Sequence, residues 1–185
     1  LLILFMMFFI IICCEKSQDK KTLLKNIIEK NLNTKLNLPD SLFTYKPFES
    51  YKSDSIKIIN SRLKICTYVN ASCGTCISKI NTWENFAKEI SKYGVPILLI
   101  CESDDNFEFM KYLCESESVK GFSYPFFLDK KNKYVKLNPF MKKAESFKTV
   151  LIDDENKILL MGNPIENKKI KELYLKEIQK RFKIK

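Results

Sequence analysis

The sequence contains no histidine, and this absence excludes more chemistry than any other feature of its composition. Histidine is the usual acid or base near neutral pH and a common ligand of zinc and haem iron. Catalysis by histidine, haem ligation through histidine and the mixed cysteine and histidine zinc sites are therefore excluded. We expect neither a cofactor nor a metal site.

Arginine is nearly absent as well. Arg62 and Arg181 are the only two, although the formal net charge of the 185-residue chain is +10. Proteins that read nucleic acids use the planar guanidinium group for bidentate contacts. The lysines are spread along the chain among Asp and Glu, and no cluster of them stands out. We therefore expect no nucleic-acid partner, while a weak attraction to an anionic membrane surface stays open.

The chain also lacks a hydrophobic run long enough to span a bilayer. The apolar segment 1–12 is shorter than the ~20 residues that a spanning helix needs, but it suits the hydrophobic region of a secretory signal. Its end, Ile11-Ile12-Cys13-Cys14, resembles a bacterial lipobox with Cys14 as the lipidation site. Choosing Cys13 as the acceptor would put the bulky Ile12 where a small residue is required. We expect a lipoprotein signal over residues 1–14, and an ordinary cleaved signal or a short anchor is the alternative.

Either kind of leader places the protein outside the cytoplasm, in the cell envelope, where disulfides persist. Acyl chains on Cys14 would anchor it to a membrane, facing the periplasm or the cell surface, without a spanning helix. Residues 15–56 are predicted to form a linker and an N-terminal helical extension. The remaining residues, 57–185, are long enough for one domain.

What the sequence does contain is Cys73-Gly74-Thr75-Cys76, directly after an apolar run over residues 63–69. Apolar residues then recur with a period near 3.6, which predicts a helix to about Tyr93. They are Ile77, Ile80, Trp83, Phe86, Ala87 and Ile90. Gly94 ends this helix, and residues 95–100 read as a second buried strand. The two cysteines therefore lie where a strand passes into a helix.

This position has a chemical consequence for Cys73. The unpaired N–H groups and the positive dipole end of a helix favour a thiolate there, with the Gly74 and Thr75 backbone as stabilising groups. A Cys73 thiolate can attack a disulfide, and Cys76, one turn further, can resolve the mixed disulfide. We expect the pKa of Cys73 to lie well below ~8.5 and that of Cys76 to stay high. An inert structural disulfide is the alternative.

The rest of the chain reads as alternating helices and strands. We predict helices over 22–36 (with Thr22 as N-cap) and 106–116, a strand over 124–128, a weakly periodic piece over 132–142, and a hairpin of 147–152 with 157–161. Asn163-Pro164 is predicted to open the last helix. That helix should bury Ile170, Leu173, Tyr174, Ile178 and Phe182.

This order resembles the thioredoxin-like superfamily, and in particular its membrane-tethered extracytoplasmic thiol–disulfide oxidoreductases of the cytochrome c maturation type. The resemblance is carried by three stretches: Thr67–Cys76, Tyr124–Asp129 and Thr149–Ile158. It implies an α/β sandwich in which helices flank a central mixed β-sheet. It also implies a protein client with a thiol or disulfide, and an upstream redox partner.

The chain departs from that family at three places. Ser72 stands where the family has Trp, and Thr67 where a buried acid assists proton transfer. The proline expected just before Thr149 is absent, with Phe147 and Lys148 in its place. A cis peptide bond without proline costs about 2.5–4 kcal/mol, so we expect a trans loop.

Other candidate residues have structural alternatives. Zinc would need Cys66, Cys101 and Cys114 to converge on the pair, whereas their apolar surroundings predict buried thiols. Trp83 is predicted to lie in the core. Lys148 would stabilise a Cys73 thiolate if it faced the sulfur, and a solvated lysine is the alternative.

Two functions follow from these residues. The first is an extracytoplasmic thiol–disulfide oxidoreductase that uses Cys73 and Cys76. The second is a membrane-tethered binding or scaffold lipoprotein in which the CxxC pair is only a structural disulfide.

Overall fold

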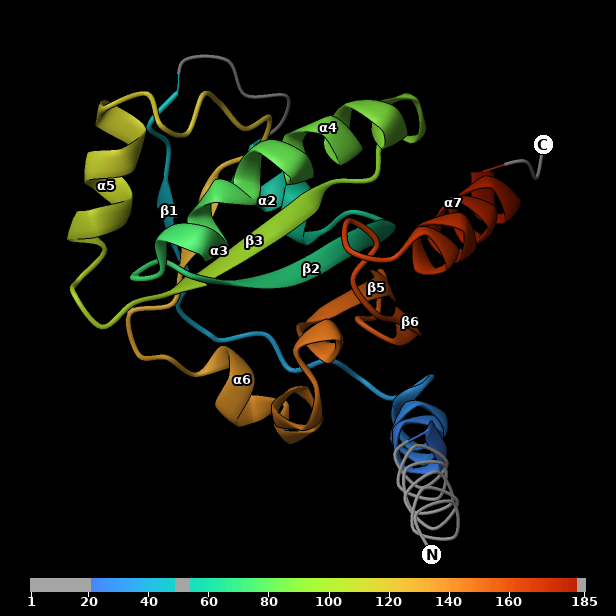
Figure 1. Cartoon of the computed structure of the whole chain (residues 1–185). Coiled ribbons are helices and arrows are strands. Elements are labelled where there is room, and N and C mark those ends of the chain that lie inside the picture. Colours follow the sequence, from blue (N-terminus) through green and yellow to red (C-terminus); the bar gives the residue numbers. More distant parts are fainter. Residues whose placement is uncertain (1–20, 49–53, 183–185) are drawn as a thin grey trace, which may run out of the picture.

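The fold is described from a computed structural model, which defines residues 21–48 and 54–182 (Figure 1). A six-stranded mixed sheet has the order β1-β4-β3-β2-β5-β6. Its strands are β1 (Phe43–Tyr45), β2 (Leu63–Asn70), β3 (Ile97–Glu102), β4 (Phe126–Leu128), β5 (Thr149–Asp153) and β6 (Ile158–Met161). Strands β2, β3 and β4 are parallel, and β1, β5 and β6 are antiparallel to their neighbours.

Helices flank this sheet, as expected for a thioredoxin-like sandwich. They are α2 (Ser55–Ile59), α3 (Gly74–Ser78), α4 (Ile80–Ile90), α5 (Glu108–Glu115), α6 (Tyr134–Leu137) and α7 (Lys168–Phe182), with 3-10 turns η1 (Ser91–Tyr93), η2 (Pro139–Lys143) and η3 (Glu145–Lys148). In Figure 1, α3 and α4 run along one side of the sheet and α6 lies on the other. The predicted α/β thioredoxin-like fold is confirmed.

The strand–helix–strand unit around the cysteines forms as the hydrophobic pattern predicts. Strand β2 pairs in parallel with β3, with Ile65 opposite Ile97. All six apolar residues of the predicted stripe, from Ile77 to Ile90, are buried. Gly94 ends the helical part of this unit with φ 64°, a left-handed conformation that glycine adopts without a steric cost. The apolar stripe therefore fixes the helix on the sheet and the cysteines at its exposed start.

The helix itself is not continuous. The hydrogen-bonded segments α3 and α4 meet at Lys79, which keeps right-handed angles of φ −69° and ψ −13°. Residues 74–93 thus form two helices and a closing 3-10 turn rather than the single helix predicted. Lys79 is therefore both the C-cap of α3 and the N-cap of α4.

The N-terminal helix ends earlier than predicted. Among the described residues, those from 21 to 31 are helical, so Thr22 lies inside the helix and is not its N-cap. Leu36 is fully buried beyond the helix end, beside a bridge between Lys35 and Lys157. The helical spacing of apolar residues in the sequence continues to Leu36 because this segment enters the core after the helix has ended.

The last helix begins later than predicted. Asn163 accepts a hydrogen bond from the Ile165 N–H and shapes a turn, whereas Asn167 accepts from the Ile170 N–H at the start of α7. The proline therefore belongs to the turn. Of the five residues predicted to be buried, Tyr174 and Ile178 are, Ile170 is half-buried, and Leu173 and Phe182 are exposed.

The predicted hairpin of β5 and β6 and the predicted strand at β4 are confirmed. Cys14, Cys13 and the whole segment 1–14 lie outside the described residues, so lipidation and the proposed domain boundaries stay predictions. Among residues 21–48 and 54–182, no helix is long and apolar enough to cross a membrane.

Candidate functional site

The two cysteines meet at the start of α3. Cys73 is the N-cap residue, with extended angles of φ −118° and ψ 110°, and its carbonyl accepts from the N–H groups of Cys76 and Ile77 at 3.0 Å. The two sulfur atoms lie 2.7 Å apart, with the Cys76 thiol donating to the Cys73 sulfur. The Thr75 hydroxyl is 3.2 Å from the same sulfur. Both cysteines are partly exposed, so a second disulfide can reach them.

These contacts separate the acidities of the two thiols. Hydrogen bonds from the Cys76 thiol and the Thr75 hydroxyl, with further help from backbone N–H groups of the same residues, lower the pKa of Cys73 from 9.0 to about 7. Burial, followed by the hydrogen bond to Cys73, raises the pKa of Cys76 to about 11. The direction is the one predicted from the helix start. The side-chain donors, however, contribute more than the backbone, and they were not part of that prediction.

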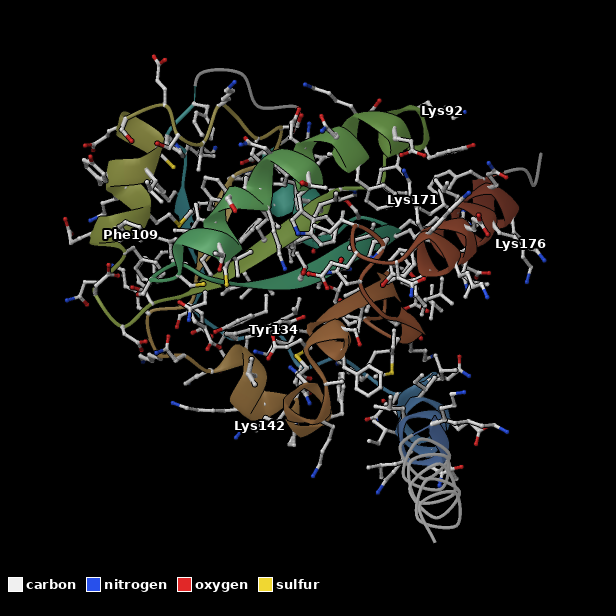
Figure 2. The ribbon with its side chains drawn as sticks, in the orientation of Figure 1. Lys92, Phe109, Tyr134, Lys142, Lys171 and Lys176 are labelled. Carbon is white, nitrogen blue, oxygen red and sulfur yellow. The ribbon has the colours of Figure 1, made fainter. Side chains whose placement is uncertain are left out.

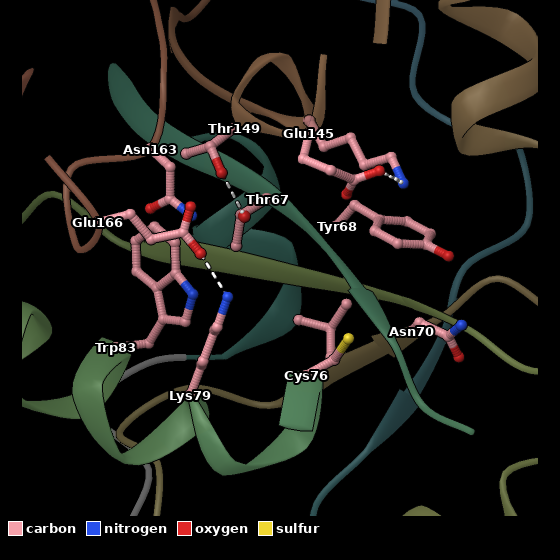
Figure 3. A pocket seen from close by; sticks show the side chains of 12 residues that line it. Thr67, Tyr68, Asn70, Cys76, Lys79, Trp83, Glu145, Thr149, Asn163 and Glu166 are labelled. Carbon is pink, nitrogen blue, oxygen red and sulfur yellow. Dashed lines mark hydrogen bonds and ion pairs between the residues drawn. The ribbon is translucent and has the colours of Figure 1, made fainter. Parts of the chain in front are cut away.

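A cavity of about 130 Å³ opens beside Cys76 (Figure 3). It lies between β2, the α3–α4 joint, η3 and the turn before α7. Its lining comprises Thr67, Tyr68, Val69, Asn70, Cys76, Lys79, Trp83, Glu145, Lys148, Thr149, Asn163 and Glu166. The groups that can act on the Cys76 sulfur are therefore those of this cavity and of the CxxC turn.

A pair of threonines lies beside the two replaced family residues: Thr67 stands at the position of the acid, and Thr149 directly follows the position of the proline. The buried hydroxyls of Thr67 and Thr149 lie 2.6 Å apart (Figure 3), joining β2 to the first residue of β5. The described peptide bonds, including those of the loop before Thr149, are all trans, as expected. This position behind Cys76 thus holds a neutral hydrogen bond and no proton acceptor of carboxylate type.

Lys148 lines the cavity but is held by other partners. Its ammonium lies 3.0 Å from a Glu145 carboxylate oxygen and 4.3 Å above the ring of Tyr68. These partners hold the ammonium in place of the Cys73 sulfur. The side chain is only 19% exposed, so it is not a solvated lysine either. Neither alternative proposed from the sequence describes this residue.

Lys79 is the charged residue that the sequence analysis missed. Its ammonium forms an ion pair with Glu166, from the turn before α7, across the cavity (Figure 3). This pair and, more weakly, negative charge on Cys76 and Cys73 raise the pKa of Lys79, so it stays protonated. In return, the Lys79 charge acts to lower the pKa of Cys76. Its spacing three residues after Cys76 was a visible signal, but nothing in the sequence pointed to Glu166.

Ser72, which replaces the family's Trp, joins a polar cluster instead. Its hydroxyl donates to the Asp105 carboxylate at 3.0 Å and accepts from the Asp104 N–H at 2.9 Å. Phe109 of α5 packs nearby, with its ring 3.7 Å from where a Cβ on Gly74 would lie. The β3–α5 connection therefore holds Ser72 by hydrogen bonds, and α5 contacts the CxxC turn at Gly74.

The other cysteines and Trp83 lie in the core, as predicted. Cys66 and Cys101 are fully buried and Cys114 nearly so. Burial raises the pKa of all three thiols, that of Cys66 to about 12. Within the described residues, no group of three or more Cys, Asp and Glu side chains is arranged to hold a metal ion. Trp83 is 3% exposed, and it also borders the cavity.

Solved structures with the same fold are distant in sequence. A thioredoxin-like protein in its oxidized form matches with a TM-score of 0.51 and 12% identity over 84% of this chain and 97% of that one. An uncharacterized thioredoxin-like protein from Porphyromonas gingivalis gives 0.48 and 17% over 82% and 95%. One from Bacteroides caccae gives 0.44 and 19% over 88% and 55%. No curated protein sequence matches this chain.

The sequence model of the Redoxin family matches residues 49–176, which is more than half of the chain. The matched range holds the CxxC turn and every strand of the sheet except β1. With the thioredoxin-like fold, this match supports the predicted oxidoreductase, and it leaves the reacting residues to be proposed from geometry. The chain belongs to the Redoxin family.

Proposed function

We propose that the protein is an extracytoplasmic thiol–disulfide oxidoreductase whose reacting groups are the Cys73 and Cys76 thiols. One observation carries the proposal. Two sulfur atoms 2.7 Å apart have pKa values of about 7 and about 11, so near neutral pH about half of the Cys73 thiol is a thiolate while Cys76 keeps its proton. A nucleophile and a resolving thiol need this division of roles.

The reaction follows from that division. The Cys73 thiolate attacks one sulfur of a client disulfide, forming a mixed disulfide and releasing the other client sulfur as a thiolate. Cys76 then loses its proton to solvent and attacks Cys73, and the second client sulfur leaves. Two electrons pass from the dithiol to the client, and the client thiolates take protons from water. The reverse sequence oxidises a client, so the direction depends on the upstream partner.

The second step needs help, because burial, the largest cause of the raised pKa of Cys76, still opposes its ionisation when Cys73 is in the mixed disulfide. The Thr67–Thr149 pair supplies no base. The Lys79 ammonium, held by Glu166, is the cavity cation whose charge lowers the pKa of Cys76, and it stabilises the thiolate that must form. Lys79 thus takes over electrostatically part of what a buried acid does by proton transfer.

A tethered binding or scaffold lipoprotein, with the CxxC pair as a structural disulfide, is the second candidate. Two replacements favour it, because the acid and the proline that family members use beside the disulfide are both absent, with Thr67 in place of the acid and Phe147 and Lys148 in place of the proline. The low pKa of Cys73 favours the oxidoreductase, since a structural clip gains nothing from a stabilised thiolate.

Alkylation with iodoacetamide distinguishes the two. The reduced protein is alkylated over a range of pH and each cysteine is quantified by mass spectrometry. An apparent pKa of about 7 at Cys73 supports the oxidoreductase. A value at or above ~8.5, that of a free thiol, would make the scaffold the better account.

The client can be captured directly. A Cys76→Ser variant expressed in the native host should accumulate mixed disulfides on Cys73, because the resolving thiol is gone. A Cys73→Ser, Cys76→Ser double variant is the matched control. Equal recovery of proteins from both would contradict the assigned nucleophile.

We further propose that acyl chains on Cys14 tether the protein to a membrane of the cell envelope. Metabolic labelling with a palmitate analogue, in wild type and in Cys14→Ala, tests this. Label retained in the variant would move the acceptor to Cys13, and no label in either would indicate a secreted protein without an anchor.

A further inference from the structure

One surface segment concentrates most of the chain's excess charge. Residues 130–143 contain six lysines and neither Asp nor Glu, so they contribute +6 to a chain whose formal charge is +10. The lysines are Lys130, Lys131, Lys133, Lys136, Lys142 and Lys143. This lysine-rich segment spans the turn after β4, α6 and η2. The expectation that no cluster of lysines stands out was therefore wrong.

The lysine-rich segment has no internal countercharge. Elsewhere, Lys79, Lys88, Lys111, Lys148, Lys157 and Lys171 each pair with a glutamate. Within the part of the chain that the structure describes, none of the six lysines forms an ion pair, and all but the half-buried Lys133 are exposed. The flanking acids are already engaged, since buried Asp129 accepts from the Lys131, Lys133 and Tyr134 N–H groups and Glu145 pairs with Lys148.

The backbone under these lysines is fixed. Tyr134 and Met141 are fully buried and anchor α6 and η2 to the core. Leu137, at the end of α6, is nevertheless 40% exposed between the lysines. A rigid surface that combines unpaired lysines with an exposed leucine is suited to an interface that is anionic outside and apolar beneath.

The N-terminal extension reaches the domain at this same surface. Asn37 and Asn138 are joined by two hydrogen bonds of 3.0 and 2.8 Å, and the Asn37 amide also reaches the Leu137 carbonyl at 3.4 Å. The helix of residues 21–31 precedes Asn37, and Figure 1 places it on the same side of the sheet as α6. Figure 2 shows Lys142 on that side, away from Phe109 on α5.

We propose that the lysine-rich segment docks the domain on an anionic lipid surface. The partner is the headgroup layer of acidic phospholipids, which attracts several lysines at once, while Leu137 enters the interface. The docking needs no acyl chain and no redox reaction, so it is independent of the proposed function. Were Cys14 also acylated, lipid and lysines would together supply the two signals that stable anchoring requires.

Vesicle co-sedimentation of the full chain, expressed without acylation, tests the proposal. Vesicles of phosphatidylcholine alone are compared with vesicles containing one third phosphatidylglycerol, at low and at high salt. The wild-type protein should bind the anionic vesicles preferentially and lose that preference at high salt. Equal binding to both vesicle types would overturn the proposal, because binding would then come from apolar insertion alone.

The variant that decides the location replaces all six lysines by Gln. Its matched control replaces six exposed lysines elsewhere, so both variants carry a formal charge of 10 − 6 = +4. The control positions are Lys57, Lys92, Lys168, Lys169, Lys176 and Lys180. Each lysine near an anionic bilayer contributes a factor of about five, so the first variant should bind at least about a hundredfold more weakly and the control nearly as wild type.

Two results would contradict the proposal. Equal losses in both variants would mean that only the net charge matters. Tighter binding to polyglutamate than to the anionic vesicles would assign the surface to an acidic protein. Circular dichroism melts of both variants establish that they remain folded, as expected for exposed positions.

Discussion

The CxxC turn and the lysine-rich segment both hold charge at the surface, and they handle it in opposite ways. In the turn, two donors on Cys76 and Thr75 converge on one sulfur, and the pKa of Cys73 falls to about 7. In residues 130–143, none of six cations forms an ion pair among the described residues. Internal contacts stabilise the first charge, whereas the second set is left available to a partner.

The contrast shows which kind of site a short sequence motif can predict. A stabilised thiolate depends on angles and distances within one helical turn, so a short motif announces it. A docking surface depends on the absence of partners, which only the packing of the surrounding elements decides. Four experiments test this difference between the two regions.

The largest effect is expected from Cys73 itself. In a protein whose Cys13 and Cys14 are replaced by Ser, Cys73→Ala should reduce the reaction with an aromatic disulfide to the background rate, because burial raises the pKa of every other thiol among the described residues. Release of the chromogenic thiol is followed by absorbance. Cys114→Ala is the matched control and should react as wild type. A variant without Cys73 that still reacts would place the nucleophile elsewhere.

The pH dependence follows from the two thiol pKa values. Alkylation of Cys73 should rise through a midpoint near pH 7, and that of Cys76 only near pH 11. The folded-state pKa of Cys73 lies below its unfolded value, so its thiolate adds stability above about pH 9 that is lost as the pH falls through about 7. Urea unfolding of the reduced protein against Cys73→Ser, at several pH values below 9, measures this contribution. The six-lysine variant should leave the Cys73 midpoint unchanged, since the two regions act independently.

A smaller effect is expected at Lys79. Lys79→Met should slow the resolving step by roughly three- to tenfold and raise the pKa of Cys76, because the nearby cation is lost. Lys79→Arg should restore both, which a purely structural role would not predict for the pKa. Stopped-flow measurement of mixed-disulfide decay gives the rate. Lys88→Met, which removes an exposed lysine paired with Glu84 on α4, is the control. Equal slowing in the control would remove Lys79 from the mechanism.

The smallest effect concerns the anchor of the lysine-rich segment. The Tyr134 hydroxyl is buried without a hydrogen-bond partner in the described part of the chain. Tyr134→Phe keeps the ring and removes this unpaired group, so the free energy of unfolding should rise by about 1 kcal/mol. Urea denaturation measures it, and vesicle binding should not change. A loss of stability would show that the hydroxyl has a partner, such as a buried water.

Much of the fold was determined by the sequence itself. The apolar run of β2, the stripe from Ile77 to Ile90 and Gly94 were sufficient to predict a strand, a helix and its end. A strand buried on both faces reads as a short apolar run, and burial on one face imposes a period of 3.6 on a helix. The errors lie at element ends and at the Lys79 joint within the predicted helix. Asn163-Pro164 could equally open a helix or a turn, and only the docking of α7 put the helix start after Asn167.

The site divides in the same way. The spacing of Cys73 and Cys76 and their place before an amphipathic stripe came from the sequence, since the geometry of one helical turn is local. The Thr67–Thr149 bond and the Lys79–Glu166 pair join residues 82 and 87 positions apart, and the diversion of Lys148 to Tyr68 likewise crosses elements. Only the tertiary structure decided those contacts, because which side chains meet across a sheet depends on how the elements pack and not on their spacing along the chain.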